Sequence, residues 1–234
     1  PGVMQYSGGV AAEAGHHLVR VRFPRVVPIA AGWQAIAAWL DARKLPRTAF
    51  CACELRSPAP FTEDGFRAFN TVYAGTLRDW GILADGANPV ARSNVCPAID
   101  PPAEPGFHAF VACAPGDGGG FVVSGSGETP EGLGNYSDNV IARGDVSEAG
   151  MRAKAHWVLG EMERRMAELG ATWADATAVQ AYTVHEMLPA MRDLVVPRGA
   201  AAHGLVWHFA RPPVVGLEFE MDVRGVSKEV LLRP

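Results

Sequence analysis

The sequence predicts an α+β fold built from two consecutive copies of one unit. The expected strands and helices follow the same order in each half: strand, helix, strand, helix and then two strands. Such a mixed order is typical of a layered fold in which helices cover one face of a sheet. The length of 234 residues suits one large domain or two small ones. The repeated order favours two domains, and one irregular α+β domain is the alternative.

The first half contains the elements of one such unit. Apolar and polar residues alternate over 17–23, which is typical of a strand. The next segment, 31–44, has apolar residues at helical spacing, and Pro46 ends it. Thr62 can cap a second helix. The apolar stripe of that helix consists of Phe66, Phe69, Tyr73, Leu77 and Trp80. The other expected strands are 48–55, 91–99 and 107–113.

The second half follows a glycine-rich stretch, 115–120, that predicts a turn or linker. A strand is expected over 121–126, followed by a long loop over 127–144. Asp145 or Ser147 caps the most strongly amphipathic helix. Its apolar stripe consists of Met151, Ala155, Val158, Leu159, Met162, Met166 and Leu169, with Gly170 at the C-terminal end. The remaining elements are strands at 175–185, 205–210 and 215–223 and a short helix at 187–194.

The composition excludes several classes of protein. The net charge is −4, whereas nucleic-acid binders normally show a basic face. No apolar run approaches the roughly 18 residues that a membrane-spanning helix needs, so no membrane association is expected. Residues 1–13 lack the basic and apolar regions of a signal peptide, which favours a cytoplasmic location. A hydrophobic content of 48% with six Trp predicts a proper buried core.

The cysteines and glycines do not indicate a cofactor. The four cysteines are Cys51, Cys53, Cys96 and Cys113. Their spacing fits neither a disulfide framework nor a zinc site, so free thiols in a cytosolic protein are the favoured interpretation. No His-Glu-x-x-His motif, Cys-x-x-Cys pair or spaced carboxylate cluster suggests a metal site. The glycine-rich stretches do not open helices as phosphate-binding loops do. We therefore expect neither a metal nor a nucleotide cofactor.

Several segments resemble, in order and spacing, the RidA family, also called the YjgF/YER057c superfamily. In the second half they are FVVSG at 121–125, the helix after Asp145, ATAVQAYTVHE from Ala176 and GLEFEMDV from Gly216. In the first half, NPVARSNV at 88–95 resembles the family segment that carries a substrate-binding arginine. The resemblance implies two tandem RidA-like (chorismate-mutase-like) domains, each a mixed β-sheet with helices packed on one face. The N-terminal domain, 1–115, is degenerate, and the C-terminal domain covers 121–234.

The resemblance also implies that each half keeps a different part of the family's site. Arg92 stands where the family has its substrate-binding arginine, and the second half has His203 at the corresponding place. The second half keeps the Ser124-Gly125 turn and the closing-strand acid Glu218, which the family uses near the reacting water. Because family sites lie in clefts between neighbouring domains, a composite site between two domains is expected.

The tandem arrangement most resembles the branch of 2-aminomuconate and 2-amino-5-chloromuconate deaminases. That resemblance implies hydrolysis of the enamine or imine of a 2-amino-unsaturated dicarboxylic acid to a 2-oxo acid and ammonia. Arg92 would bind a substrate carboxylate through two parallel hydrogen bonds. Backbone N–H groups of Asn94 and Gly125 would donate to that carboxylate or to the developing charge, and Ser124 would add a hydroxyl contact. Glu218 would orient water and move the proton.

Two features of the site stay open. Glu220 follows Glu218 by two positions, and one of these acids is expected to face solvent. A second substrate carboxylate would need another cation or donor. The candidates are His203, Arg143 and Arg198. The first half has His108 in place of the closing-strand acid, so a second site formed by His108 and His203 is also open.

Two other functions and one assembly complete the expectations. A RidA-like protein that binds a small molecule such as a 2-oxo acid, without turnover, is the main alternative. Ribonuclease action, from an older family name, is disfavoured by the acidic balance. Family trimers close a ring of three domains, and three two-domain chains would supply two stacked rings. We therefore expect a homotrimer with a pseudo-hexameric domain arrangement.

Overall fold

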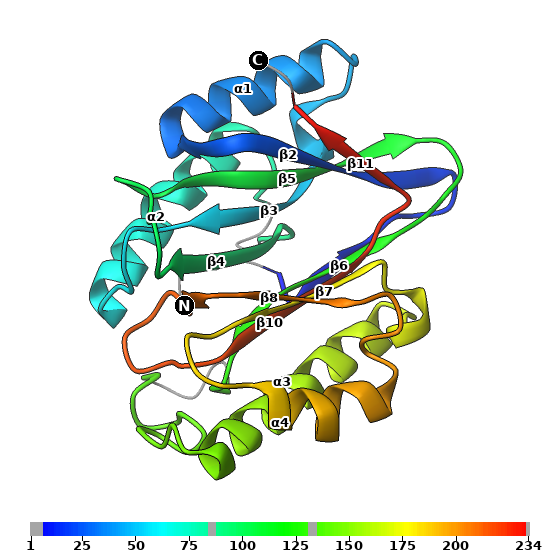
Figure 1. The fold of residues 1–234 in the computed structure, drawn as a ribbon. Coiled ribbons are helices and arrows are strands. Elements are labelled where there is room, and N and C mark those ends of the chain that lie inside the picture. Colours follow the sequence, from blue (N-terminus) through cyan, green and yellow to red (C-terminus); the bar gives the residue numbers. More distant parts are fainter. Residues whose placement is uncertain (1–6, 84–87, 131–134, 233–234) are drawn as a thin grey trace.

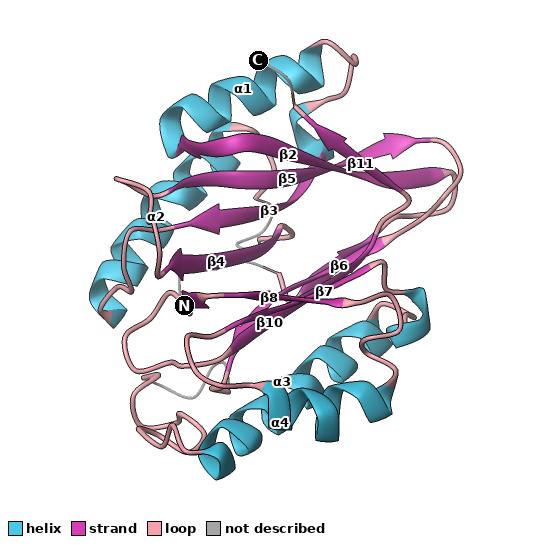
Figure 2. Cartoon of the chain, in the orientation of Figure 1, coloured by secondary structure: helices cyan, strands magenta, loops and turns pink. Residues whose placement is uncertain are grey.

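A computed structural model describes residues 7–83, 88–130 and 135–232, so residues 131–134 of the expected long loop lie outside the described part. The described chain forms four layers, with two sheets face to face and helices on both outer faces (Figures 1 and 2). The α+β prediction is confirmed.

The first sheet carries the helices of the first half. Its strand order is β11-β2-β5-β3-β4-β9. These strands are β2 (His16–Pro28), β3 (Phe50–Arg56), β4 (Ala91–Pro97), β5 (Gly106–Pro115), β9 (Ala210–Arg211) and β11 (Lys228–Leu231). Its outer face buries apolar side chains against α1 (Ile29–Asp41) and α2 (Glu63–Asp79).

The second sheet carries the helices of the second half. Its strand order is β1-β6-β10-β7-β8. These strands are β1 (Gly9–Ala11), β6 (Phe121–Gly127), β7 (Ala178–Tyr182), β8 (Leu205–His208) and β10 (Glu220–Gly225). Its outer face packs on α3 (Glu148–Glu168) and on the short α4 (Leu188–Ala190), which continues as a π-helical turn over Met191–Val195.

Both sheets repeat one topology. In the first, β2 pairs antiparallel with β5, β5 antiparallel with β3, and β3 parallel with β4. In the second, β6, β10, β7 and β8 make the same three pairings in the same order. The outermost strands cross over, because β1 pairs with β6 and β11 pairs with β2. The domain limits 1–115 and 121–234 stay a prediction.

Helix starts follow the expected capping chemistry. The hydroxyl of Thr62 accepts a hydrogen bond from the Gly65 N–H at the start of α2. Ser147 rather than Asp145 caps α3, and its hydroxyl accepts from the Gly150 N–H. Both caps satisfy N–H groups that the first helical turn leaves without partners.

The strand expected over 215–223 begins only at Glu220. The preceding segment instead crosses to the first half, where the Val215 N–H donates to the Phe61 carbonyl oxygen and Val214 bridges to Phe61. This pairing joins residues far apart in sequence, so local alternation does not reveal it. It brings residues 213–217 close to the start of α2.

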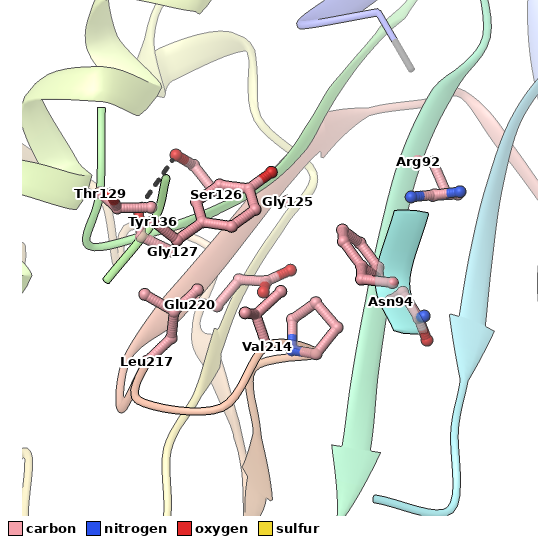
Figure 3. A pocket seen from close by; sticks show the side chains of 12 residues that line it. Arg92, Asn94, Gly125, Ser126, Gly127, Thr129, Tyr136, Val214, Leu217 and Glu220 are labelled. Atoms are coloured by element: carbon pink, nitrogen blue, oxygen red, sulfur yellow. Dashed lines mark hydrogen bonds between the residues drawn. The ribbon is translucent and has the colours of Figure 1, made fainter. Parts of the chain in front are cut away.

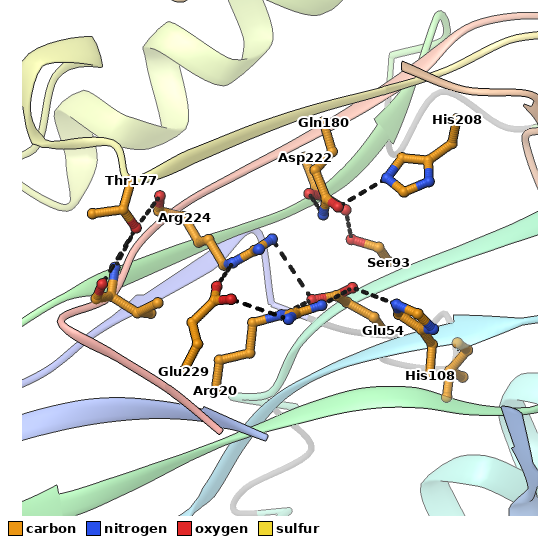
Figure 4. A network of polar contacts seen from close by, with 12 residues as sticks. Arg20, Glu54, Ser93, His108, Thr177, Gln180, His208, Asp222, Arg224 and Glu229 are labelled. Atoms are coloured by element: carbon orange, nitrogen blue, oxygen red, sulfur yellow. Dashed lines mark hydrogen bonds and ion pairs between the residues drawn. The ribbon is translucent and has the colours of Figure 1, made fainter. Parts of the chain in front are cut away.

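The space between the sheets is partly polar (Figure 4). Arg20 donates to both carboxylate oxygens of Glu54, at 2.6 and 2.9 Å, and Arg224 lies 3.8 Å from the same carboxylate. The hydrogen bonds from Arg20 and the nearby arginine charges lower the pKa of Glu54 despite its burial. An apolar cluster that includes Leu18, Ala52 and Val226 fills another part of the space.

The described residues bear on two further expectations. All four cysteines are free thiols, as expected. Burial raises the pKa of the Cys53 thiol to about 12, so this thiol is unreactive at neutral pH. No helix in the described ranges has the length and apolar character needed to cross a membrane.

Candidate active site

A pocket of about 40 Å³ opens where β4 of the first sheet approaches β6 of the second (Figure 3). Arg92 and Asn94 of β4 line one side, and residues 125–127 of β6 line the other. Thr129 and Tyr136 extend the β6 side, and Glu220 of β10 lies between the two sides. The cover consists of Phe66, Pro213, Val214 and Leu217. The site therefore combines residues of both halves.

Arg92 supplies the positive charge of the pocket. The residue is only 3% exposed, and its guanidinium carbon lies 4.9 Å from the ring centroid of Tyr73 and 5.5 Å from that of Phe66. These rings belong to the apolar stripe of α2, and their π-faces favour a nearby cation. The apolar stripe of α2 therefore forms part of the hydrophobic core and also packs against the Arg92 guanidinium.

A hydrogen bond between the halves fixes the start of β4. The Arg92 backbone N–H donates to Ser124 Oγ at 2.9 Å, and the Ser124 hydroxyl donates to the Ser7 carbonyl oxygen. Ser124 does not line the pocket, so its hydroxyl ties β4, β6 and the N-terminal segment together. We therefore assign Ser124 a structural contact rather than a substrate contact.

Gly125 lines the pocket at a position where a side chain would collide with neighbouring atoms. A Cβ atom added at this position would lie 2.1 Å from Glu220 Oε1 and 3.3 Å from the Cα atom of Ser93. The first contact is too close for a real Cβ atom, so the Glu220 carboxylate would have to move, and the second contact is tight. Glycine therefore allows the carboxylate of Glu220 to take its observed position.

Glu220 is the acid of the pocket. The residue is 3% exposed, and it lines the pocket together with Arg92. Burial, followed by the negative charges of Asp222 and Glu128, raises the pKa of Glu220 well above its usual range. Arg56 and Arg92 oppose this rise without cancelling it. A raised pKa favours the protonated form of the acid, which is the form that can donate a proton.

A model of the 2-aminomuconate deaminase CnbZ family matches residues 1–230. The chain is also 46% identical over 236 residues to a 2-amino-5-chloromuconate deaminase from Comamonas testosteroni, covering 99% of this chain and 94% of that protein. The chain belongs to the CnbZ family. The branch of deaminases predicted from the sequence resemblance is thereby confirmed.

Solved structures align with this chain at lower identity. A chorismatase crystal structure aligns with 94% of this chain and 77% of its own, with a TM-score of 0.57 and 14% identity. This similarity concerns the fold of the whole two-sheet chain. The YjgF gene product from E. coli aligns with 47% of this chain and 81% of its own, with a TM-score of 0.34 and 15% identity.

In this CnbZ family member, Glu218 lies outside the pocket. Its Oε2 atom is 2.7 Å from His185 Nε2 and 3.1 Å from Arg211 Nη1. Because β10 begins only at Glu220, Glu218 belongs to the preceding loop, and its carboxylate takes these partners instead. Neither acid is fully exposed, contrary to the expectation that one of them faces solvent. The acid that shares the pocket with Arg92 is Glu220.

The other predicted binding residues divide between the pocket and the surface. Asn94 lines the pocket, and its Oδ1 atom accepts a hydrogen bond from Ser57 Oγ at 3.0 Å. His203 lies in an exposed turn before β8 and does not line the pocket. The two arginines considered for a second carboxylate, Arg143 and Arg198, do not line the pocket either. Arg143 lies 3.9 Å from Asp138, and Arg198 lies 3.1 Å from Glu163.

Asp222 connects β4 with the strands β10 and β7 of the other sheet. Its carboxylate accepts hydrogen bonds from Ser93 Oγ at 2.6 Å and Gln180 Nε2 at 2.7 Å (Figure 4). It also accepts a hydrogen bond from Tyr182 Oη at 2.8 Å. Ser93 lies between Arg92 and Asn94, so this bond fixes β4 against β10. The spacing of Glu220 and Asp222 in one strand was the available sequence signal, since such residues share a face.

Proposed function

We propose that this chain is a cofactor-independent deaminase of 2-amino-unsaturated dicarboxylic acids such as 2-aminomuconate. It would hydrolyse the enamine or imine to the 2-oxo acid and ammonia, as a hydrolase acting on a C–N bond. The observation that carries the proposal is the shared pocket of a buried guanidinium, Arg92, and a buried acid of raised pKa, Glu220. Membership of the CnbZ family supports the same substrate class.

Arg92 would hold the carboxylate next to the reacting carbon. A guanidinium binds a carboxylate through two parallel N–H···O bonds, which fix the plane of the carboxylate. The aromatic rings that surround Arg92 exclude water and strengthen this attraction. Binding in one orientation places the amino-bearing carbon near Glu220, and such positioning lowers the barrier.

Glu220 would then serve as both acid and base. In its protonated form it donates a proton to a carbon of the enamine, which gives the 2-imino acid and leaves a carboxylate. That carboxylate takes a proton from water as the water oxygen adds to the imine carbon. The C–N bond breaks when the nitrogen leaves as ammonia with the remaining proton. One water is consumed, and the 2-oxo acid and ammonia are formed.

Ammonia release from 2-aminomuconate tests this activity directly. We expect the purified chain to release ammonia well above the rate in buffer, with saturation at high substrate concentration. Release at the buffer rate would contradict the proposal. Saturable binding of a 2-oxo acid without ammonia release would support the non-catalytic binding protein instead.

We also propose the homotrimer with a pseudo-hexameric domain arrangement. Edge strand β8 supports it, because Val206, Trp207 and nearby Phe209 are exposed by 38–50%. The strand at the same place in the first sheet, β4, is covered by the other half of the chain. A second copy would cover β8 in the same way. Light scattering should give the mass of three chains, and the mass of a monomer would contradict the proposal.

The cytoplasmic location stays a prediction.

A further inference from the structure

The proposed substrate has two carboxylates, but the described lining of the pocket contains a single cation. Arg92 can hold the carboxylate next to the amino group. Glu220 exchanges its proton in the proposed reaction, and its ionised form repels a second carboxylate. The distal carboxylate must therefore meet neutral donors within the pocket, or remain in water.

Two residues that line the pocket have buried polar atoms with no hydrogen-bond partner among the described residues. These atoms are Asn94 Nδ2 and Thr129 Oγ1, and their residues are 3% and 4% exposed. A buried polar atom without a partner destabilises the folded protein, so such atoms are rare in native structures. Both of these atoms belong to residues that line one pocket, where a bound ligand can supply the missing hydrogen bonds.

These atoms lie on opposite sides of the pocket. Asn94 follows Arg92 by two positions on β4, so the two side chains belong to the same wall. Thr129 follows β6 on the other wall, and the Glu220 carboxylate lies between Thr129 and Arg92 (Figure 3). A ligand anchored on Arg92 and extending past Glu220 therefore points its far end toward Thr129.

The neighbouring residue Glu128 holds Thr129 in place. The Glu128 carboxylate accepts hydrogen bonds from the N–H groups of Glu218, at 2.6 Å, and Phe219, at 3.1 Å. It also lies 3.2 Å from Lys154 Nζ, and both side chains of this ion pair are fully buried. The Thr129 N–H itself donates to the Gly127 carbonyl oxygen at 2.9 Å. The hydroxyl is therefore positioned before a ligand arrives.

We propose that the Thr129 hydroxyl binds the distal carboxylate of the substrate and makes the enzyme selective for dicarboxylic acids. This inference rests on the proposed function for the identity of the substrate. It assigns Thr129 a binding role and no part in the proton transfers. Asn94 Nδ2, on the Arg92 wall, would donate to the carboxylate next to the reacting carbon.

A matched pair of inert ligands tests the inference without turnover. The probes are 2-oxoadipate and 2-oxohexanoate, which have the same chain length and differ in the distal carboxylate. By calorimetry, the parent protein should bind 2-oxoadipate more tightly. Thr129→Val should weaken 2-oxoadipate binding about tenfold, because a hydrogen bond to a charged group is lost. It should leave 2-oxohexanoate binding unchanged.

Two further variants separate a specific role from a general disturbance. Thr129→Ser keeps the hydroxyl and should retain the preference for 2-oxoadipate. Thr71→Val changes an exposed threonine on α2 and should behave as the parent protein. Equal losses for both ligands in Thr129→Val, or no loss for either, would overturn the inference.

Kinetics distinguish failure of this inference from failure of the proposed function. If the parent releases no ammonia from 2-aminomuconate but shows the Thr129-dependent preference, the deaminase proposal fails and the dicarboxylate site stands. If the parent is active, Thr129→Val should lower kcat/KM for 2-aminomuconate about tenfold. It should leave hydrolysis of the imine of pyruvate, generated in situ, unchanged. An active Thr129→Val with unchanged kcat/KM for 2-aminomuconate would reject the site.

Discussion

Strands β4 and β8 occupy corresponding places in the four-strand arrangement that the two sheets share, but the pocket that contains Arg92 and Glu220 is lined by β4 and not by β8. β4 is buried along almost its whole length and places Arg92 and Asn94 against β6 of the other half. β8 has partly or largely exposed residues throughout and contains no arginine. The shared fold provides the same location in both sheets. A binding site forms there only where a strand of the other half covers the location and where polar side chains such as Arg92 and Asn94 are present.

The largest effect is expected from removing the cation of β4. Arg92→Ala should lower kcat/KM by about 10² to 10³, because truncating one partner of a buried charge pair costs about 2–5 kcal/mol. Ammonia release measures it. Arg143→Ala is the matched control, since Arg143 is exposed outside the pocket and should have little effect. Parent-like rates for Arg92→Ala would remove the basis for distinguishing β4 from β8.

The next effect concerns the acid that faces β4. Glu220→Gln should lower kcat by roughly 10² to 10⁴, since proton transfer by a positioned group contributes about that much. The amide keeps the shape of the side chain but cannot exchange the proton. Glu218→Gln is the matched control and should keep most of the activity. If Glu218→Gln lost more activity than Glu220→Gln, the proton-transfer role would belong to Glu218, as the family resemblance implies.

Gly125→Ala should disturb the contact between β6 and Glu220. The added methyl group overlaps the Glu220 carboxylate, so we expect a loss of about 1–3 kcal/mol in the free energy of unfolding and a clear loss of activity. Urea unfolding and ammonia release measure these effects. Gly160→Ala is the control, because a Cβ atom there meets open space on α3. A stable and fully active Gly125→Ala protein would show that Glu220 need not enter the pocket.

Asp222→Asn should change the pH dependence of the reaction. The negative charge of Asp222 contributes to the raised pKa of Glu220, so removing that charge lowers the pKa. Activity that requires protonated Glu220 falls as the pH rises through this pKa. The falling limb of kcat/KM against pH should therefore move to lower pH. Ser93→Ala removes a hydrogen bond to Asp222 without removing the charge and should leave that limb in place.

The smallest effect is expected near β8. His203→Ala should change kcat/KM by less than about twofold, because exposed residues away from a site rarely contribute more than about 0.5 kcal/mol. A large loss of activity in steady-state kinetics would mean that β8 also takes part in a site, and that the two strands are more alike than their burial suggests.

The sequence was informative where the signal was local. Arg92 and Gly125 were predicted from short motifs, and the structure brings both to one pocket between the halves. The predicted order of helices and strands was also correct. Each helix or strand is determined by the periodicity and capping residues of its own segment. These features required no knowledge of distant contacts.

The remaining features depend on contacts between distant segments. Residues 213–215 pair with Phe61, and β10 begins only at Glu220, which lines the pocket. Thr129 lies in a loop without periodicity, and its position follows from the buried pair of Glu128 and Lys154. The edge strands β1 and β11 are short and join the sheet of the other half. Local sequence patterns do not report such pairings.

The central claim is that one composite pocket, between β4 and β6, binds the substrate. A crystal structure of the protein with 2-oxoadipate tests it most directly. We expect one carboxylate on the Arg92 guanidinium, the oxo carbon next to Glu220 and the other carboxylate on the Thr129 hydroxyl. A ligand bound beside β8 and His203, or on Glu218 and Arg211, would contradict it.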